Sequence, residues 1–189
     1  QGERKNARFE HDGISPDLPH VILTGGEGEI HALSYFHIGY LLEGSHLPEE
    51  LSMDLLDILV EKGLNIEQPD RVVGAATWGW GITVAIYLAR WISRSRTRDC
   101  KYAYVDKVSD GVQKEFVWRG TPLANGERVL IVDDVFTTLG TVLVVSRMVQ
   151  NMSGRVLPWM AGVVNQCGKE EVNGIKLAAT IVLPPPPTW

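Results

Sequence analysis

The segment from Arg128 to Thr141 reads RVLIVDDVFTTLGT and is the stretch of the chain that says most about its fold. The apolar run that ends at Val132 predicts a buried strand, and Asp133 and Asp134 follow directly at its carboxyl end. A short loop rich in hydroxyl groups comes next, and a helix is predicted from Thr141 to about Met152. In open α/β sheets, ligands bind outside the carboxyl ends of the strands. The segment therefore predicts an α/β fold with a ligand site at this edge.

The rest of the chain alternates predicted strands with predicted helices. Further helices are predicted for Pro48–Lys62 and Ile82–Ser93. Further strands are predicted for Arg71–Val73, Lys101–Val105, Glu115–Trp118, Leu157–Val164 and Ile175–Leu183, and a polar loop for Asp106–Lys114. This alternation predicts a mostly parallel central sheet flanked by helices. We expect one domain over residues 1–189, with 1–17 as a flexible or peripheral N-terminal segment.

The composition is typical of a globular protein, with 189 residues of which 44% are hydrophobic and 22% charged. A net charge of -5 argues against partners such as nucleic acid or an anionic membrane.

Cys100 and Cys167 lack metal-ligand spacing and are expected as free thiols. The uncharged stretch Val72–Ala89 holds three glycines, which favours a strand, a loop and a buried helix over a membrane span. The polar stretch 1–12 has no apolar segment and is not expected to be a signal peptide, so a cytoplasmic protein is expected.

The loop after the aspartates has the chemistry of an anion site. It consists of Thr137, Thr138, Leu139, Gly140 and Thr141. Loop amides, hydroxyl groups and a helix N-terminus together suit a phosphate. Two carboxylates beside a phosphate make sense if the ligand also presents sugar hydroxyls. A Mg²⁺ ion that bridges those hydroxyls and a diphosphate would balance the charge.

The segment Arg128 to Thr141 resembles the diphosphoribose-binding signature of type I phosphoribosyltransferases. The resemblance implies an α/β fold with a small hood built from the N- and C-terminal parts. It also implies that Thr137 to Thr141 hold a 5-phosphate, and that Asp133 and Asp134 hold ribose hydroxyls and stabilise positive charge on the sugar. Mg²⁺ would be held mainly through the substrate rather than by protein ligands. Leu139 stands where the family usually has glycine.

Other segments resemble the orotate branch of that family. The segment His20–Gly26 is similar to an early stretch that lies near the base. The resemblance implies that Gly74, Ala75, Ala76 and Thr77 contact the diphosphate. It further implies a homodimer, in which Lys107 reaches the diphosphate of its own or of a neighbouring subunit. The tryptophans Trp78 and Trp80 are interpreted as core or interface packing, with stacking on a ligand as the alternative.

The run Ala161–Gly168 resembles a further segment of the orotate branch, but Gln166 stands where the family has an arginine that helps hold the pyrimidine. Glutamine donates and accepts hydrogen bonds but supplies no charge to an anionic base. A lysine that some members carry near Thr24 is also missing. The resemblance implies transfer of ribose 5-phosphate from phosphoribosyl diphosphate to orotate. Two alternatives remain open: a purine or another base as acceptor, and a regulator that binds phosphoribosyl diphosphate without catalysis.

Overall fold

The computed structural model describes residues 8–10, 21–24, 29–32, 34–36, 46–76, 80–109 and 114–184. The helices are α2 (Leu47–Glu61), α3 (Trp80–Arg94) and α4 (Gly140–Asn151). The first strands along the chain are β1 (Arg8–Glu10), β2 (Val21–Thr24), β3 (Glu29–Ala32), β4 (Ser34–Phe36) and β5 (Arg71–Ala76). The others are β6 (Lys101–Ser109), β7 (Lys114–Arg119), β8 (Arg128–Phe136), β9 (Arg155–Asn165), β10 (Glu171–Val172) and β11 (Ile175–Val182).

The main sheet has seven strands in the order β10-β11-β9-β8-β5-β6-β7. The strands β11, β9, β8, β5 and β6 run parallel, whereas β10 and β7 pair antiparallel at the two edges. The predicted fold class is therefore confirmed. β8 lies between β9 and β5, and this central position explains why its sequence is apolar up to the two aspartates.

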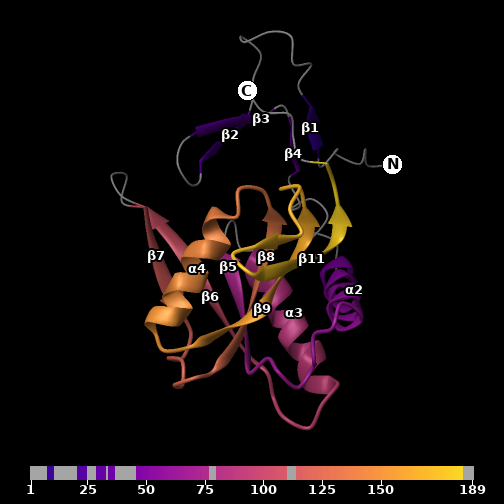
Figure 1. Cartoon of the computed structure of the whole chain (residues 1–189), viewed down its shortest axis with the longest axis vertical. Coiled ribbons are helices and arrows are strands. Elements are labelled where there is room, and N and C mark those ends of the chain that lie inside the picture. The colour runs from indigo at the N-terminus through magenta and orange to yellow at the C-terminus, as the bar shows by residue number, and fades with distance from the viewer. Residues whose placement is uncertain are drawn as a thin grey trace.

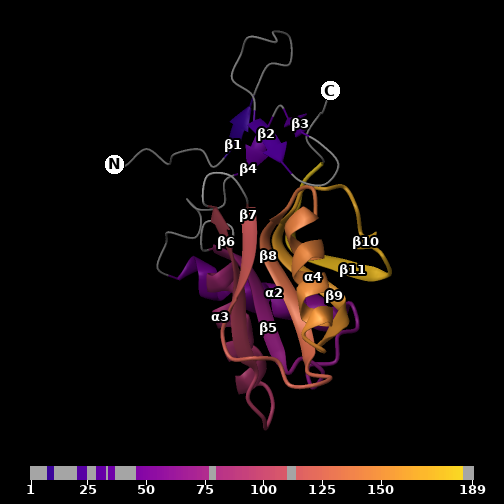
Figure 2. The same cartoon turned by 90° about the vertical axis from the view of Figure 1, so that its left-hand side faces the viewer.

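Helices cover both faces of the sheet. α2 and α3 pack on one face and α4 on the other, as Figures 1 and 2 show. On α4 the buried residues Val142, Val145 and Val149 recur at helical spacing, so one stripe of the helix faces the sheet. The core is thus divided into two apolar layers, one on each side of β8 and β5.

The N-terminal strands form two small antiparallel pairs, β1 with β4 and β2 with β3. In Figures 1 and 2 they lie beyond the carboxyl ends of the parallel strands, where the predicted hood would lie. Of the predicted segment 1–17, the structure describes only Arg8–Glu10, which is a strand. The C-terminal residues 185–189 lie outside the described residues.

The predicted polar loop Asp106–Lys114 is wrong in large part. β6 continues to Ser109 and β7 begins at Lys114, and the two strands pair antiparallel, so only residues 110–113 lie outside the described hairpin. Polar side chains occur here because β7 is an edge strand with solvent beside it. The other predicted elements are confirmed with shifted ends: β5 continues to Ala76, and β8 to Phe136.

The stretch Val72–Ala89 contributes to β5 and to α3, which begins at Trp80 rather than at Ile82. None of the helices in the described part of the chain is long and apolar enough to cross a membrane. Cys100 and Cys167 are unpaired with each other, as predicted.

Candidate active site

Asp133 and Asp134 lie near the carboxyl end of β8 and are almost fully buried, with 6% and 9% of their surface exposed. The Oδ1 atom of Asp133 accepts the backbone N–H of Asp134 at 3.0 Å, and Oδ1 of Asp134 accepts that of Val135 at 2.8 Å. Burial, and then the neighbouring Asp134 carboxylate, raise the pKa of Asp133 well above its ordinary value. In the unliganded protein, the Asp133 carboxyl group therefore favours its protonated form.

The hydroxyl loop follows at once and leads into α4. The side chains of Thr137 and Thr138 are half-buried, and Thr138 Oγ1 accepts the backbone N–H of Gly140 at 3.4 Å. Since α4 begins at Gly140, its first-turn amides have no carbonyl partner within the helix. Amides at a helix N-terminus together with loop hydroxyls can bind a phosphate.

Leu139 has a left-handed backbone, with φ 62° and ψ 3°. A left-handed conformation costs a residue other than glycine roughly 1–2 kcal/mol. The Leu139 side chain is only 5% exposed and packs in the apolar layer with Phe136 and Val142. Burial of a leucine contributes about 1.5–3 kcal/mol and offsets this cost. The loop thus has a backbone conformation that glycine would favour, although leucine occupies the position.

The segment predicted to contact diphosphate lies at the end of β5. Gly74 and Ala75 are buried there, Ala76 is the last residue of the strand, and Thr77 lies outside the described residues. A Cβ on Gly74 would overlap the carbonyl oxygen of Gly81 in the first turn of α3. Gly74 is therefore required for the close packing of α3 on β5, a reason that the sequence pattern did not indicate.

The tryptophan beside this segment packs in the core. Trp80 is partly buried and contacts the apolar layer beneath α2 and α3, which confirms the packing interpretation for this residue. Trp78 lies outside the described residues.

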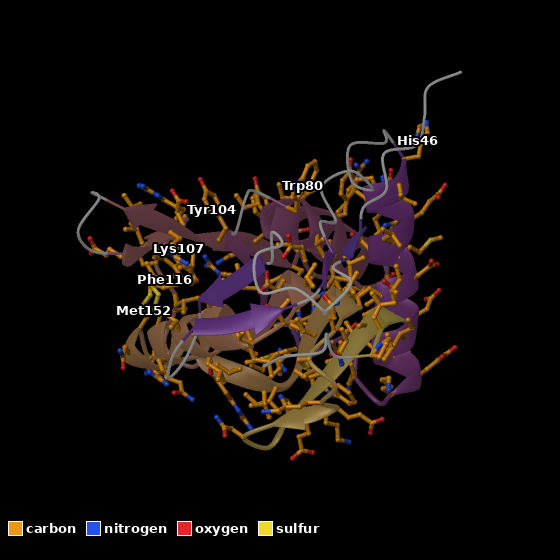
Figure 3. The ribbon with its side chains drawn as sticks, turned by 90° about the horizontal axis from the view of Figure 1, so that it is seen from above. His46, Trp80, Tyr104, Lys107, Phe116 and Met152 are labelled. Atoms are coloured by element: carbon orange, nitrogen blue, oxygen red, sulfur yellow. The ribbon has the colours of Figure 1, made fainter. Side chains whose placement is uncertain are left out.

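Lys107 lies on a strand and not on a loop. It is exposed on β6, and its Nζ atom lies 5.8 Å from the ring centre of Phe116, its cross-strand neighbour. Figure 3 shows the two side chains together on the hairpin formed by β6 and β7. β5 separates β6 from β8, and two strand spacings amount to about 10 Å. The structure therefore does not bring Lys107 into contact with the acid pair. Arg119, the last residue of β7, pairs with Asp106 on β6 at 3.7 Å.

Gln166 lies directly after β9 and is brought next to the hydroxyl loop. Its backbone N–H donates to the carbonyl oxygen of Phe136 at 2.9 Å, one residue before Thr137.

The sequence pattern did not indicate that Phe136 packs on Gly162, where a Cβ would lie 2.9 Å from the aromatic ring. The signal was present, because a glycine inside a predicted strand often marks a close approach.

The described residues contain no group of three or more His, Cys, Asp or Glu side chains that could hold a metal ion. The buried Asp133 and Asp134 offer carboxylate oxygens, a kind of ligand that Mg²⁺ takes in small number beside substrate phosphates.

No family model matches the chain. A curated protein of Caldicellulosiruptor saccharolyticus named orotate phosphoribosyltransferase is 27% identical over 164 residues, covering 87% of this chain and 75% of that protein. A protein of the same name from Caldanaerobacter subterraneus subsp. tengcongensis is 31% identical over 138 residues, covering 73% of this chain and 63% of its own length.

Solved structures show the same fold at lower identity. Orotate phosphoribosyltransferase from Aeropyrum pernix has a TM-score of 0.60 at 21% identity and covers 87% of this chain and 85% of its own. Adenine phosphoribosyltransferase from Thermoanaerobacter pseudethanolicus has a TM-score of 0.61 at 16% identity, with coverages of 79% and 88%. The fold is that of the type I phosphoribosyltransferases. Within that class, the curated relatives carry the orotate name, so the resemblance to the orotate branch is confirmed.

Proposed function

We propose that this protein transfers ribose 5-phosphate from phosphoribosyl diphosphate to a nitrogenous base, with orotate as the first acceptor and orotidine monophosphate as the product. The observation that carries the proposal is the buried pair Asp133–Asp134, followed at once by the hydroxyl loop and the N-terminus of α4. A sugar phosphate presents the matching groups, namely hydroxyls for the carboxylates and a phosphate for the amides. The names of the curated relatives support orotate.

In the proposed reaction, the loop from Thr137 to Thr141 holds the 5-phosphate, and Asp133 and Asp134 hold the ribose hydroxyls. The bond from the ribose anomeric carbon to diphosphate breaks, diphosphate leaves with the electron pair, and the base nitrogen bonds to that carbon and loses its proton. The acid pair stabilises the positive charge that develops on the sugar. Catalysis is then mainly placement and electrostatic stabilisation.

The diphosphate is proposed to lie against the segment from Gly74 to Thr77. Gly74 helps place the first turn of α3 beside this segment, which adds further backbone N–H groups. Mg²⁺ would neutralise diphosphate charge when bound, and we propose that the ribose hydroxyls and the diphosphate supply most of its ligands.

We also propose a homodimer in which Lys107 reaches the diphosphate, because its exposed position on β6 leaves it outside the acid cluster of its own chain. Mixing of the Lys107→Ala and Asp134→Asn variants tests this role. If Lys107 acts in the neighbouring subunit, hybrid dimers regain one intact site and activity returns. If Lys107 acts in its own subunit, each hybrid site stays defective and activity stays low.

The substrate is tested with phosphoribosyl diphosphate, Mg²⁺ and a panel of orotate, uracil, adenine, hypoxanthine and guanine, with nucleotides separated by chromatography. Formation of orotidine monophosphate is expected. A purine nucleotide instead would favour the alternative acceptor. Binding of phosphoribosyl diphosphate with no transfer to any base would overturn the enzymatic proposal and favour a regulator.

A further inference from the structure

The aromatic ring of Phe136 packs directly on a glycine of the neighbouring strand. A Cβ built on Gly162 of β9 would lie 2.9, 3.0 and 3.1 Å from three carbon atoms of this ring. The ring therefore occupies space that any other residue at position 162 would need. Phe136 is only 1% exposed and is packed among the other buried side chains of the layer beneath α4. Because protein interiors are close-packed, the ring has no free space to move into, and a Cβ at position 162 would displace its backbone.

This contact lies at the base of the proposed sugar-phosphate site. Gly162 pairs with Asp133 in the register of β8 and β9, and Phe136 is the last residue of β8, directly before Thr137. The carbonyl oxygen of Phe136 accepts the backbone N–H of Gln166 at 2.9 Å, which ties the end of β8 to the end of β9. A displacement of Phe136 would therefore reach the first residue of the hydroxyl loop.

The loop itself is attached to the same apolar layer at a second point. Leu139 is 5% exposed and belongs to this layer together with Phe136. The half-buried Thr137 and Thr138 lie between these two buried side chains in the chain. The loop is thus fixed on both sides of its hydroxyl groups before any ligand binds. A loop that is already ordered loses less conformational freedom on binding, and its affinity for the ligand is higher for that reason.

We propose that Phe136 and Gly162 are positioning residues: the ring packed on Gly162 sets the place of the loop from Thr137 to Thr141, and so sets its affinity for the 5-phosphate of the ribose. This inference rests on the proposed function. Phe136 and Gly162 act through the loop backbone and not by touching the ligand, and a small displacement of a binding group is enough to weaken its contacts strongly.

The test measures the binding of ribose 5-phosphate, and of inorganic diphosphate with Mg²⁺, by calorimetry. In Gly162→Ala, the dissociation constant of ribose 5-phosphate should rise about 10–100-fold, because a displacement of about 1 Å can cause a loss of this size. The dissociation constant of diphosphate should change by about twofold or less, because diphosphate is proposed to lie at the end of β5, away from this contact.

A second substitution shows whether the loss comes from the ring. The shorter side chain in Phe136→Leu leaves room for a Cβ at position 162. When Gly162→Ala is added to Phe136→Leu, it should therefore weaken ribose 5-phosphate binding by only about threefold or less. If Gly162→Ala does not fold, Phe136→Leu alone decides. Without the ring, ribose 5-phosphate binding should weaken by at least about threefold while diphosphate binding stays unchanged.

Gly154→Ala is the matched control. A Cβ on Gly154 would lie 2.8 Å from Leu123 Cδ1 and 2.9 Å from Val149 Cγ1, so the overlap is similar and involves the same apolar layer. Gly154 follows the C-terminal end of α4, however, whereas the hydroxyl loop precedes its N-terminal end. Gly154→Ala should lower the melting temperature, as Gly162→Ala does, but it should leave ribose 5-phosphate binding unchanged.

Three results would overturn this inference while the proposed function stands. They are unchanged ribose 5-phosphate binding in folded Gly162→Ala or, if that variant does not fold, in Phe136→Leu; an equal loss from Gly162→Ala with and without Phe136→Leu; and an equal loss for ribose 5-phosphate and diphosphate, or in Gly154→Ala. If the unchanged protein binds neither phosphoribosyl diphosphate nor ribose 5-phosphate, the proposed function is overturned and this inference with it.

Discussion

The side chain of Asp133 accepts a hydrogen bond from the backbone N–H of Asp134 at 3.0 Å, and both carboxyl groups are buried at the carboxyl end of β8. No cationic side chain is among the causes of the pKa shift of Asp133, whose pKa is raised first by burial and then by Asp134. A negative charge on Asp133 beside the Asp134 carboxylate is therefore unfavourable in this buried position. This arrangement has consequences for stability as well as for activity.

We predict that Asp133→Asn stabilises the unliganded protein at neutral pH. The raised pKa means that the folded protein binds a proton that the unfolded chain, near the ordinary value of 3.8, releases. The free energy of unfolding of the unchanged protein therefore falls as pH rises above about 4, until the raised pKa is passed. Between pH 5 and pH 8, the melting temperature of the variant should increase relative to that of the unchanged protein as pH rises. If the two melting temperatures differ by the same amount at every pH, the Asp133 carboxyl group does not hold a proton in the folded protein. Asp54→Asn, on the exposed face of α2, is the control.

At Leu139, glycine should be tolerated better than alanine. Leu139→Ala loses buried apolar surface and keeps the left-handed strain, which predicts a loss of about 2–4 kcal/mol in the free energy of unfolding. Leu139→Gly loses slightly more surface, because Cβ is removed as well, but it also removes roughly 1–2 kcal/mol of strain, so it should be the more stable variant. Chemical denaturation of both variants measures the order. The reverse order would mean that φ 62° at this position does not describe the folded protein.

At the contact between β5 and α3, Gly74→Ala should destabilise the protein by about 3 kcal/mol, because the new Cβ would overlap the carbonyl oxygen of Gly81. Gly126→Ala is the matched control. Gly126 has a φ of +73°, but a Cβ added there would meet no atom within 4 Å, so only about 1 kcal/mol of backbone strain is expected. Equal losses in the two variants would show that α3 does not pack closely on Gly74.

A buried ion pair joins Arg71, the first residue of β5, to Glu127, which directly precedes β8. Arg71 Nε lies 2.9 Å from Glu127 Oε1, with side-chain exposures of 0% and 5%, and Arg71 NH1 donates to the carbonyl oxygen of Thr121 at 2.8 Å. Glu127→Gln should cost about 3–5 kcal/mol in unfolding free energy, because it leaves a buried guanidinium without its counter-charge.

The exposed pair Arg98–Glu67, 3.8 Å apart, supplies the comparison for that ion pair. Glu67→Gln should cost about 1 kcal/mol or less. Denaturation curves that shift equally for the two substitutions would contradict the importance of burial.

The sequence predicted β8, the acid pair, the loop and α4 because apolar periodicity and local chemistry coincide within one short segment. It did not predict the hairpin of β6 and β7. The polar residues there lie on an edge strand, and their sequence pattern is the same as that of a surface loop. The packing of Gly74 on Gly81 depends on two elements meeting in space, which periodicity does not report. The same holds for Gln166, whose place beside Phe136 follows from the pairing of β8 with β9.

The most direct test of the central proposal is the rate at which orotidine monophosphate forms from orotate, phosphoribosyl diphosphate and Mg²⁺, measured for the unchanged protein, Asp134→Asn and Asp54→Asn. The proposal predicts product with the unchanged protein and with Asp54→Asn. It predicts a loss of about 100-fold or more in kcat/KM with Asp134→Asn, because that group is placed to stabilise charge on the sugar. Undiminished turnover in folded Asp134→Asn would contradict the role given to the acid pair.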